Sequence, residues 1–125
     1  MPKLKKGQAA LNDLFYSYKY RAKKKNYEFC LTKEEFKNLT SKHCEYCGIE
    51  PSHSVDRAYR GRKSRFNGNY IYNGLDRVDN TRGYTIDNVV PCCKNCNSMK
   101  GDFLSFDEMK VAMDAVLKFR ENVNG

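Results

Sequence analysis

The sequence predicts an α+β fold, in which a small core of two strands and a helix carries a four-cysteine metal site between flanking helices. Three observations indicate it: an apolar stripe at helical spacing near the N-terminus, a second stripe near the C-terminus, and a strand–turn–strand pattern between two C-x-x-C pairs. The 125 residues match the length of one domain. We predict one domain over 1–125, with a helical extension over 1–28, a core over about 74–104 and a final helix over about 105–121.

The N-terminal extension is predicted to be helical over residues 8–25. Its apolar side chains recur every three or four residues and so share one face: Leu11, Leu14, Phe15, Tyr18 and Ala22. Lysines and arginines crowd the C-terminal end, where positive charge suits the helix dipole. That basic end is either a solvated helix end or a patch that contacts phosphate.

Two capping boxes predict where later helices begin. In Thr32–Glu35 and again in Ser105–Glu108, the first hydroxyl can accept a free backbone amide while the glutamate reaches back. The first of these helices is expected to end near Thr40. The second carries an apolar stripe of ordinary core packing: Phe106, Met109, Met113, Val116 and Leu117.

Residues 50–70 are predicted to form a long irregular loop, because they show no helical or strand periodicity. A loop of this length in a small domain is usually functional or disordered. Its basic side chains suit contact with phosphate groups: Arg57, Arg60, Arg62, Lys63 and Arg65. The alternative is a flexible solvated insertion.

The core is predicted to begin with a β-hairpin. Strand-forming residues lie on either side of residues 79–83, which are dense in turn formers. Pro91 is expected to end the second strand, because proline has no amide to donate to a ladder. The start of a helix then follows.

The strongest motif is the pair of C-x-x-C sequences, Cys44/Cys47 and Cys93/Cys96. The spacing lets both sulfurs of a pair reach one ion, so the four thiols are predicted to hold a structural Zn²⁺ with no open coordination position. Cys92 is expected to be packed and not to ligate.

The predicted compartment is the cytoplasm, where thiols stay reduced. The first residues carry charge but no apolar segment behind it, so no secretory signal is predicted. No apolar run approaches the roughly 20 residues that span a bilayer. The excess of Lys and Arg gives a net charge of +8, which favours a polyanionic partner such as a nucleic acid. A merely soluble basic protein is the other interpretation.

Taken in order, these motifs resemble the HNH endonucleases, the ββα-metal or His-Me finger superfamily, in a zinc-ribbon-stabilised form common in phages and mobile elements. The shared order is C-x-x-C, an Asp-X pair in the first strand, an Asn in the second, and C-x-x-C-N-x-x-K. The match covers about 29–104 and is strongest over 75–101. It implies hydrolysis of DNA phosphodiester bonds, by nicking or double-strand cleavage, with double-stranded DNA as partner.

The resemblance also implies roles for single residues. Asp76 and Asn97 match the positions that hold one divalent cation, Mg²⁺ or Mn²⁺, and both offer hard oxygen ligands. Asn88 matches the asparagine that orders the hairpin loop. Lys100 and Arg77 are expected to contact phosphate.

The chain departs from the family at the general base, because Arg77 stands where the first histidine is expected and arginine does not deprotonate near neutral pH. Another residue could be the base: Asp79 on the same strand face, or His53, whose imidazole is better matched to neutral pH. Alternatively, metal-bound water ionises without a dedicated base while Arg77 clamps the phosphate. In a third account cleavage has been lost, which leaves a DNA-binding module on the same scaffold.

The leading hypothesis from the sequence is therefore a metal-dependent DNA endonuclease, and the runner-up is that binding module. A zinc-ribbon protein that binds RNA or a protein partner is a third hypothesis. Asp76 and Asn97 discriminate between the classes, because a pure binding module has no need for two hard ligands at one site.

Overall fold

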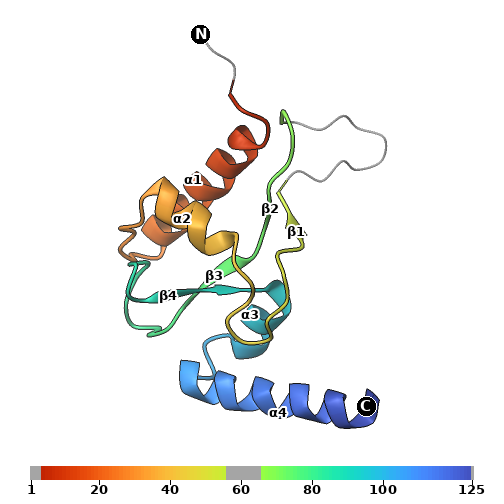
Figure 1. The fold of residues 1–125 in the computed structure, drawn as a ribbon. Coiled ribbons are helices and arrows are strands. Elements are labelled where there is room, and N and C mark those ends of the chain that lie inside the picture. The colour runs from red at the N-terminus through yellow and green to blue at the C-terminus, as the bar shows by residue number, and fades with distance from the viewer. Residues whose placement is uncertain (1–3, 56–65, 125) are drawn as a thin grey trace.

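The computed structural model describes residues 4–55 and 66–124. In that part of the chain, helices and short strands follow one another in the order α1 (Gln8–Lys24), α2 (Lys33–Thr40), β1 (His53–Ser54), β2 (Ile71–Tyr72), β3 (Gly74–Arg77), β4 (Val89–Cys92), α3 (Lys94–Lys100) and α4 (Phe106–Asn124) (Figure 1). The predicted α+β class is confirmed.

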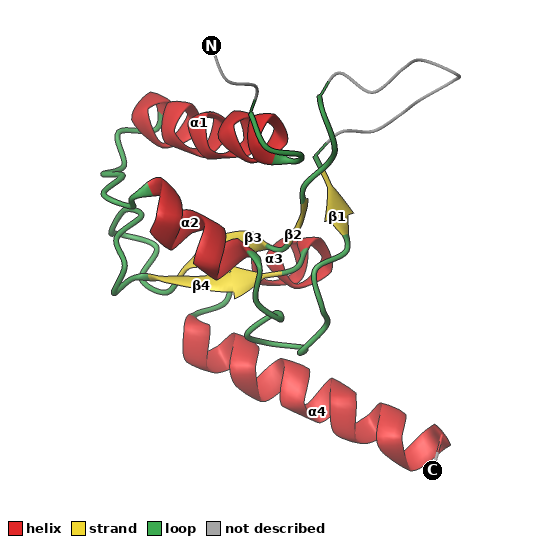
Figure 2. Cartoon of the chain, turned by 45° about the horizontal axis from the view of Figure 1, so that its top comes forward, coloured by secondary structure: helices red, strands yellow, loops and turns green. Residues whose placement is uncertain are grey.

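The antiparallel pair β3–β4 lies at the centre of the fold, with α1 and α2 on one side and α4 on the other (Figure 2). Asp76 pairs with Val90, and Arg77 pairs with Val89. Strands β1 and β2 form a second antiparallel pair. The sheet therefore separates two hydrophobic clusters.

The first cluster lies between α1, α2 and the hairpin, and includes Leu11, Leu14, Phe15, Leu31, Phe36, Leu39, Leu75 and Val89. The apolar stripe predicted for α1 faces this cluster. The Leu75 amide donates to the hydroxyl of Tyr18 at 3.2 Å, which ties α1 to β3. The second cluster joins Cys44, Tyr46, Cys92, Cys96, Met109 and Met113 beneath α4.

Both capping boxes form as predicted. The Thr32 amide donates to Glu35 at 2.9 Å while the Glu35 amide donates to the Thr32 hydroxyl at 3.0 Å. The Ser105 and Glu108 groups make the same pair of bonds at 2.8 and 3.1 Å. Each box satisfies amides that a helix start leaves without intrahelical partners, so these starts are fixed locally. None of the helices in the described residues is both long and apolar enough to cross a membrane.

The prediction that Pro91 ends the second strand is wrong, because β4 continues through Pro91 to Cys92. The Pro91 carbonyl accepts the Glu45 amide at 2.8 Å, on the side of β4 that faces away from β3. The amide and carbonyl of one residue in an antiparallel strand point to the same side. The donor that proline lacks is therefore not needed by the β3–β4 ladder.

The segment predicted as an irregular loop over 50–70 is partly regular, because β1 and β2 pair at its two ends. His53 pairs with Tyr72, and Ser54 pairs with Ile71. Strands of two residues carry too little alternation to be predicted from sequence. The basic residues between them, Arg57, Arg60, Arg62, Lys63 and Arg65, lie outside the described residues.

Candidate active site

Four thiols converge where the turn over residues 44–48, the first knuckle of the metal site, meets the start of α3. The Sγ atoms of Cys44, Cys47, Cys93 and Cys96 all lie within 4.8 Å of one another, so they could hold one metal ion. Backbone bonds shape the knuckle: the Cys44 amide donates to Ile49 at 2.9 Å and the Gly48 amide donates to Cys44 at 2.9 Å. Gly48 adopts a positive φ of 78°, which glycine adopts without strain.

The environment of Cys44 favours a thiolate. Burial opposes its ionisation, but the backbone amides of Cys47, Cys93 and Tyr46 outweigh burial and lower its pKa to about 7. Cys92 is different, because burial raises the pKa of its thiol and its sulfur lies outside the four-thiol group. Cys92 is a packed core residue, only 1% exposed.

Asp76 lies on β3, almost buried, with a carboxylate held from two sides. Its Oδ2 accepts a hydrogen bond of 2.5 Å from the Tyr46 hydroxyl. The Lys100 ammonium lies 3.3 Å from each carboxylate oxygen. Burial raises the pKa of Tyr46, and its bond to Asp76 raises it further, so Tyr46 remains a donor.

Lys100, for which the sequence led us to expect a phosphate contact, has its side chain turned into the protein. Its side chain is 0% exposed, and its ammonium also contacts the Arg77 carbonyl and the Asn80 side-chain oxygen at 3.3 Å each. A buried ammonium is retained only where it is paired, and Asp76 supplies the pair. Lys100 therefore joins α3 to the end of β3.

Asn88 is buried just before β4 and binds the backbone of the hairpin loop. Its side-chain oxygen accepts the Asp79 amide at 2.9 Å, while its Nδ2 donates to the carbonyls of Asp79 at 3.1 Å and Gly83 at 2.8 Å. Gly83 itself packs tightly, because a Cβ there would collide with the backbone of Glu28. The loop is thus held by one side chain and by close contact with the segment after α1.

Arg77 lines a cleft between α1 and the end of β3, whose volume is about 290 Å³. The cleft is also lined by Asp76 and Asn97, and its opposite wall carries Arg21 of α1 and Lys25, the residue just after α1. The two proposed cation ligands therefore open into one space. These five cationic or ligand-bearing side chains, with Tyr27 as an aromatic neighbour, suit a phosphate-bearing partner.

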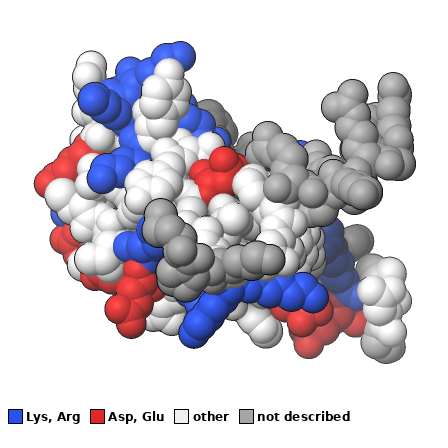
Figure 3. All heavy atoms as spheres, turned by 90° about the horizontal axis from the view of Figure 1, so that it is seen from above, with Lys and Arg blue, Asp and Glu red and all other residues white. Residues whose placement is uncertain are grey.

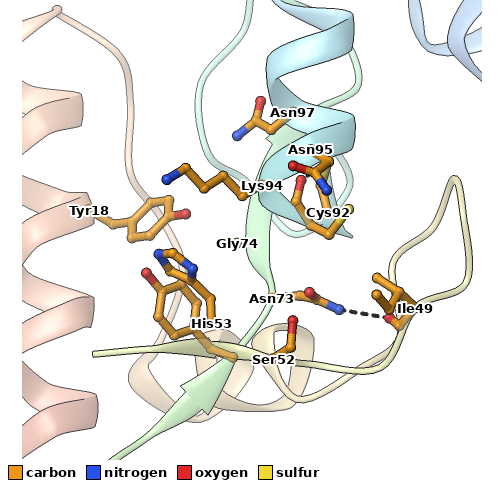
Figure 4. Close-up of a pocket in the computed structure, with 12 residues that line it drawn as sticks. Tyr18, Ile49, Ser52, His53, Asn73, Gly74, Cys92, Lys94, Asn95 and Asn97 are labelled. Atoms are coloured by element: carbon orange, nitrogen blue, oxygen red, sulfur yellow. Dashed lines mark hydrogen bonds between the residues drawn. The ribbon is translucent and has the colours of Figure 1, made fainter. Parts of the chain in front are cut away.

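A second cavity, of about 400 Å³, adjoins this cleft at Tyr18 and Asn97, which line both spaces. Figure 4 shows Tyr18, His53 and Lys94 converging on it from α1, β1 and α3. The His53 ring packs edge-on against Tyr72 at 5.2 Å between centroids. His53 is therefore on the wall of a space that reaches Asn97.

Asp79, the other candidate base, lies in the hairpin turn and does not line either space. Its Oδ1 accepts bonds from the Thr81 hydroxyl at 2.6 Å and the Thr81 amide at 2.9 Å. These bonds lower the pKa of the carboxyl group below its ordinary value. A carboxylate stabilised in this way is a poor proton acceptor.

Two curated proteins are similar to the chain. The mimivirus protein R423 of Acanthamoeba polyphaga mimivirus, named as uncharacterised, is 35% identical over 89 residues, which are 71% of this chain and 14% of that protein. YoqL, an SPbeta prophage-derived protein of Bacillus subtilis (strain 168) whose name assigns it provisionally to the HNH endonucleases, is 29% identical over 99 residues, 73% of this chain and 39% of YoqL. The chain thus spans well under half the length of these relatives. No family model matches it.

A solved structure provides the comparison of folds. The rare-cutting HNH restriction endonuclease PacI superposes with a TM-score of 0.64 over 91% of this chain and 81% of PacI, at 24% sequence identity. The chain therefore has the fold of that HNH endonuclease. The similarity to YoqL and this fold both agree with the resemblance to the HNH endonucleases that the sequence motifs indicate.

Sequence reasoning missed three features of the site. Tyr46 is separated from Asp76 by 30 positions, so no local pattern could reveal their bond. Arg21 and Lys25 were placed at the basic end of a helix, with phosphate contact as one of two interpretations, and their place on the cleft depends on how α1 packs. The N-x-x-K spacing located Lys100 on α3 but did not show that its side chain turns inward.

Proposed function

We propose that the chain is a metal-dependent DNA endonuclease that hydrolyses phosphodiester bonds. The observation that carries the proposal is that Asp76 and Asn97 open into one cleft whose far wall carries Arg21 and Lys25. The relationship to HNH proteins supports the same chemistry. A phage or mobile-element origin fits the prophage source of YoqL.

Asp76 and Asn97 would hold the catalytic cation, for which Mg²⁺ or Mn²⁺ suits a carboxylate and an amide oxygen. Bound there, the cation would supply Lewis-acid stabilisation of charge on the scissile phosphate. An ionised carboxylate offers about four acceptor positions, and Tyr46 and Lys100 make three contacts of hydrogen-bond length with Asp76. The donor set therefore fits a cation with one position of Asp76 to spare.

The ammonium of Lys100 also sets how tightly that cation is held. A carboxylate that already faces a positive charge at 3.3 Å attracts a second cation less than an unpaired carboxylate does. We therefore propose that the cation binds weakly to the free protein. The DNA phosphate would complete its coordination, so that metal and DNA bind together.

For the proton acceptor we propose His53. It lines a cavity that meets the cleft at Asn97, and an imidazole titrates in the right range for a base. Asp79 is disfavoured by its bonds to Thr81 and by its place outside both spaces. Arg77, at the position where the family has histidine, would support the loop and face the phosphate.

For the four-thiol site we propose a structural Zn²⁺. The Cys47 and Cys93 sulfurs lie 3.7 Å apart. In a tetrahedron with zinc–sulfur bonds of about 2.3 Å, two sulfurs are separated by about 3.8 Å. Four thiolates also leave no position for substrate, so this ion would stabilise the fold and take no part in hydrolysis.

Double-stranded DNA is the proposed partner, and the cleft gives better support for it than net charge does. On the face shown in Figure 3, lysine and arginine side chains form separate groups with acidic side chains between them. A continuous basic stripe would indicate a long electrostatic contact. On this face the pattern instead favours local contacts with a few phosphates.

The test is nicking of supercoiled plasmid with Mg²⁺ and with Mn²⁺, beside an Asp76→Ala variant. Metal-dependent nicking that Asp76→Ala abolishes, while thermal unfolding still shows a cooperative transition, is the expected result. Asp114→Ala, a change at an exposed aspartate on α4, is the control for loss of a carboxylate. It should nick as the wild type does.

A second candidate function is a non-catalytic DNA-binding module. It is favoured by the arginine at the expected position of the base and by the ammonium against Asp76. Binding of the same plasmid without nicking, in either metal and at every pH tested, would establish it instead.

A further inference from the structure

The first metal knuckle carries a tyrosine whose hydroxyl reaches the proposed catalytic carboxylate. Tyr46 lies between Cys44 and Cys47, is 6% exposed, and donates a 2.5 Å hydrogen bond to Oδ2 of Asp76. One residue therefore connects the four-thiol site with the cation site. The bond spans 30 positions of sequence and is buried.

Several contacts hold Tyr46 in place from the knuckle side. The preceding residue, Glu45, is fixed from both sides: its amide donates to Pro91 of β4 at 2.8 Å and its carbonyl accepts Lys110 of α4 at 3.1 Å. The Tyr46 ring packs on Phe106 with 5.6 Å between centroids. The position of the hydroxyl thus follows from the knuckle, β4 and α4 together.

The hydroxyl contributes more than packing. A phenylalanine would fill the same volume, and a buried hydroxyl gains only if it finds a partner. The partner here is a carboxylate oxygen, and the only other described group that contacts this oxygen is the Lys100 ammonium at 3.3 Å. The shorter bond therefore fixes the plane of the Asp76 carboxylate.

We propose that Tyr46 is a positioning residue through which the four-thiol site sets the orientation of Asp76 and thereby the affinity of the catalytic cation. This inference rests on the proposed function, because it needs Asp76 to be a cation ligand. Partners that orient a ligand usually change metal affinity or activity by about 10- to 100-fold when they are removed. The four-thiol metal would thus act on catalysis through geometry as well as through stability.

The test compares Tyr46→Phe with the wild type in three measurements: metal content at the four thiols, Mn²⁺ binding followed by electron paramagnetic resonance, and the Mn²⁺ concentration that gives half-maximal nicking. We expect one metal per chain at the thiols in both proteins. The Mn²⁺ concentration at half-saturation should be about 10-fold higher or more in Tyr46→Phe, in both the binding and the nicking measurement.

Tyr70→Phe is the matched control. Its hydroxyl is also bonded, to the Thr40 hydroxyl at 2.8 Å, but it lines neither space of the site. It should lose a comparable amount of stability and keep the Mn²⁺ half-saturation of the wild type. A purely structural role for Tyr46 would make the two variants alike.

The outcomes separate this inference from the proposed function. If the wild type nicks with Mn²⁺ and Tyr46→Phe shows the same half-saturation, the positioning role is overturned and the nuclease stands. If no Mn²⁺ binding by the wild type depends on Asp76 even with plasmid DNA present, both are overturned. A shifted half-saturation in Tyr46→Phe with unchanged thiol-bound metal supports both.

Discussion

The guanidinium carbon of Arg77 lies 3.8 Å from the ring centroid of Tyr27, a distance at which the cation and the ring attract one another. Its Nη1 donates to the carbonyls of Asn80 at 2.7 Å and Arg82 at 2.8 Å. The residue at the expected position of the general base therefore holds the hairpin loop against the segment after α1. Arg77 has a structural task in addition to any contact with phosphate.

The first prediction follows from these contacts. Arg77→Ala should lower the free energy of unfolding by about 1–3 kcal/mol, because two carbonyls lose a charged donor. Arg77→Lys should recover only part of this, since an ammonium cannot reproduce the planar fork. Urea denaturation of the three proteins measures the difference. Equal stability of all three, together with weaker DNA binding by Arg77→Ala, would show that Arg77 acts on phosphate alone.

The second prediction concerns the base and its pH dependence. A general base works in its deprotonated form, so cleavage is lost as the pH falls through its pKa. Hydrogen bonds from Thr81 hold the pKa of Asp79 below its ordinary value, so with Asp79 as base activity would persist well below the range in which an imidazole titrates. With His53 as base, kcat/KM for nicking should fall below about pH 6.5.

The variants for this test are His53→Gln and Asp79→Asn, assayed from about pH 5 to pH 8.5 around the ordinary imidazole range. His53→Gln should reduce kcat about 10²- to 10⁴-fold and remove the acid limb. Asp79→Asn should keep the wild-type profile. If the pH profile of His53→Gln keeps its acid limb, His53 is excluded as the base, and the limb is attributed to ionisation of metal-bound water.

Local patterns predicted much of this molecule, and their success has a physical basis. Thr32 and Glu35 form a capping box within one helical turn, and the spacing of Cys93 and Cys96 brings both sulfurs to the same side, where they could hold one ion. Such features depend on a few neighbouring residues. They can therefore be predicted from the sequence alone.

Contacts between distant segments could not be predicted in the same way. Whether Lys100 faces solvent or Asp76 depends on how α3 packs against β3, and the N-x-x-K spacing did not decide between the two. The continuation of β4 through Pro91 depends on which side of the strand faces β3. Both outcomes are set by tertiary packing, which a spacing rule does not contain.

The third prediction is that the four-thiol metal holds the second hydrophobic cluster together. Cys44 and Cys96 belong to this cluster with Met109 and Met113 of α4. Structural zinc contributes about 10–16 kcal/mol in small domains, more than the net stability of many of them. Cys47→Ser, or a strong chelator, should therefore release the metal and lower the melting temperature sharply.

The control for that prediction is Cys30→Ser, which changes an exposed thiol outside the four-thiol group. It should keep both the metal content and the melting temperature. Metal content is measured by thiol-release titration with a zinc-sensitive dye, and unfolding by circular dichroism. A Cys47→Ser protein without metal but with wild-type melting would contradict a structural role for the site.

The fourth prediction places DNA against α1. Arg21 and Lys25 line the cleft opposite Asp76, so a phosphate beside the scissile one should contact them. A plot of log affinity against log salt concentration has a negative slope, and each lost phosphate contact reduces its magnitude by about 0.9. Arg21→Ala/Lys25→Ala should therefore weaken DNA binding and reduce this slope by nearly 2, as measured by fluorescence anisotropy over a salt series. Lys37→Ala/Lys118→Ala removes the same charge from α2 and α4, outside the cleft, and should leave the slope unchanged. If both double variants reduce the slope equally, DNA binding depends on the net charge of the protein, and the cleft is not the DNA-binding site.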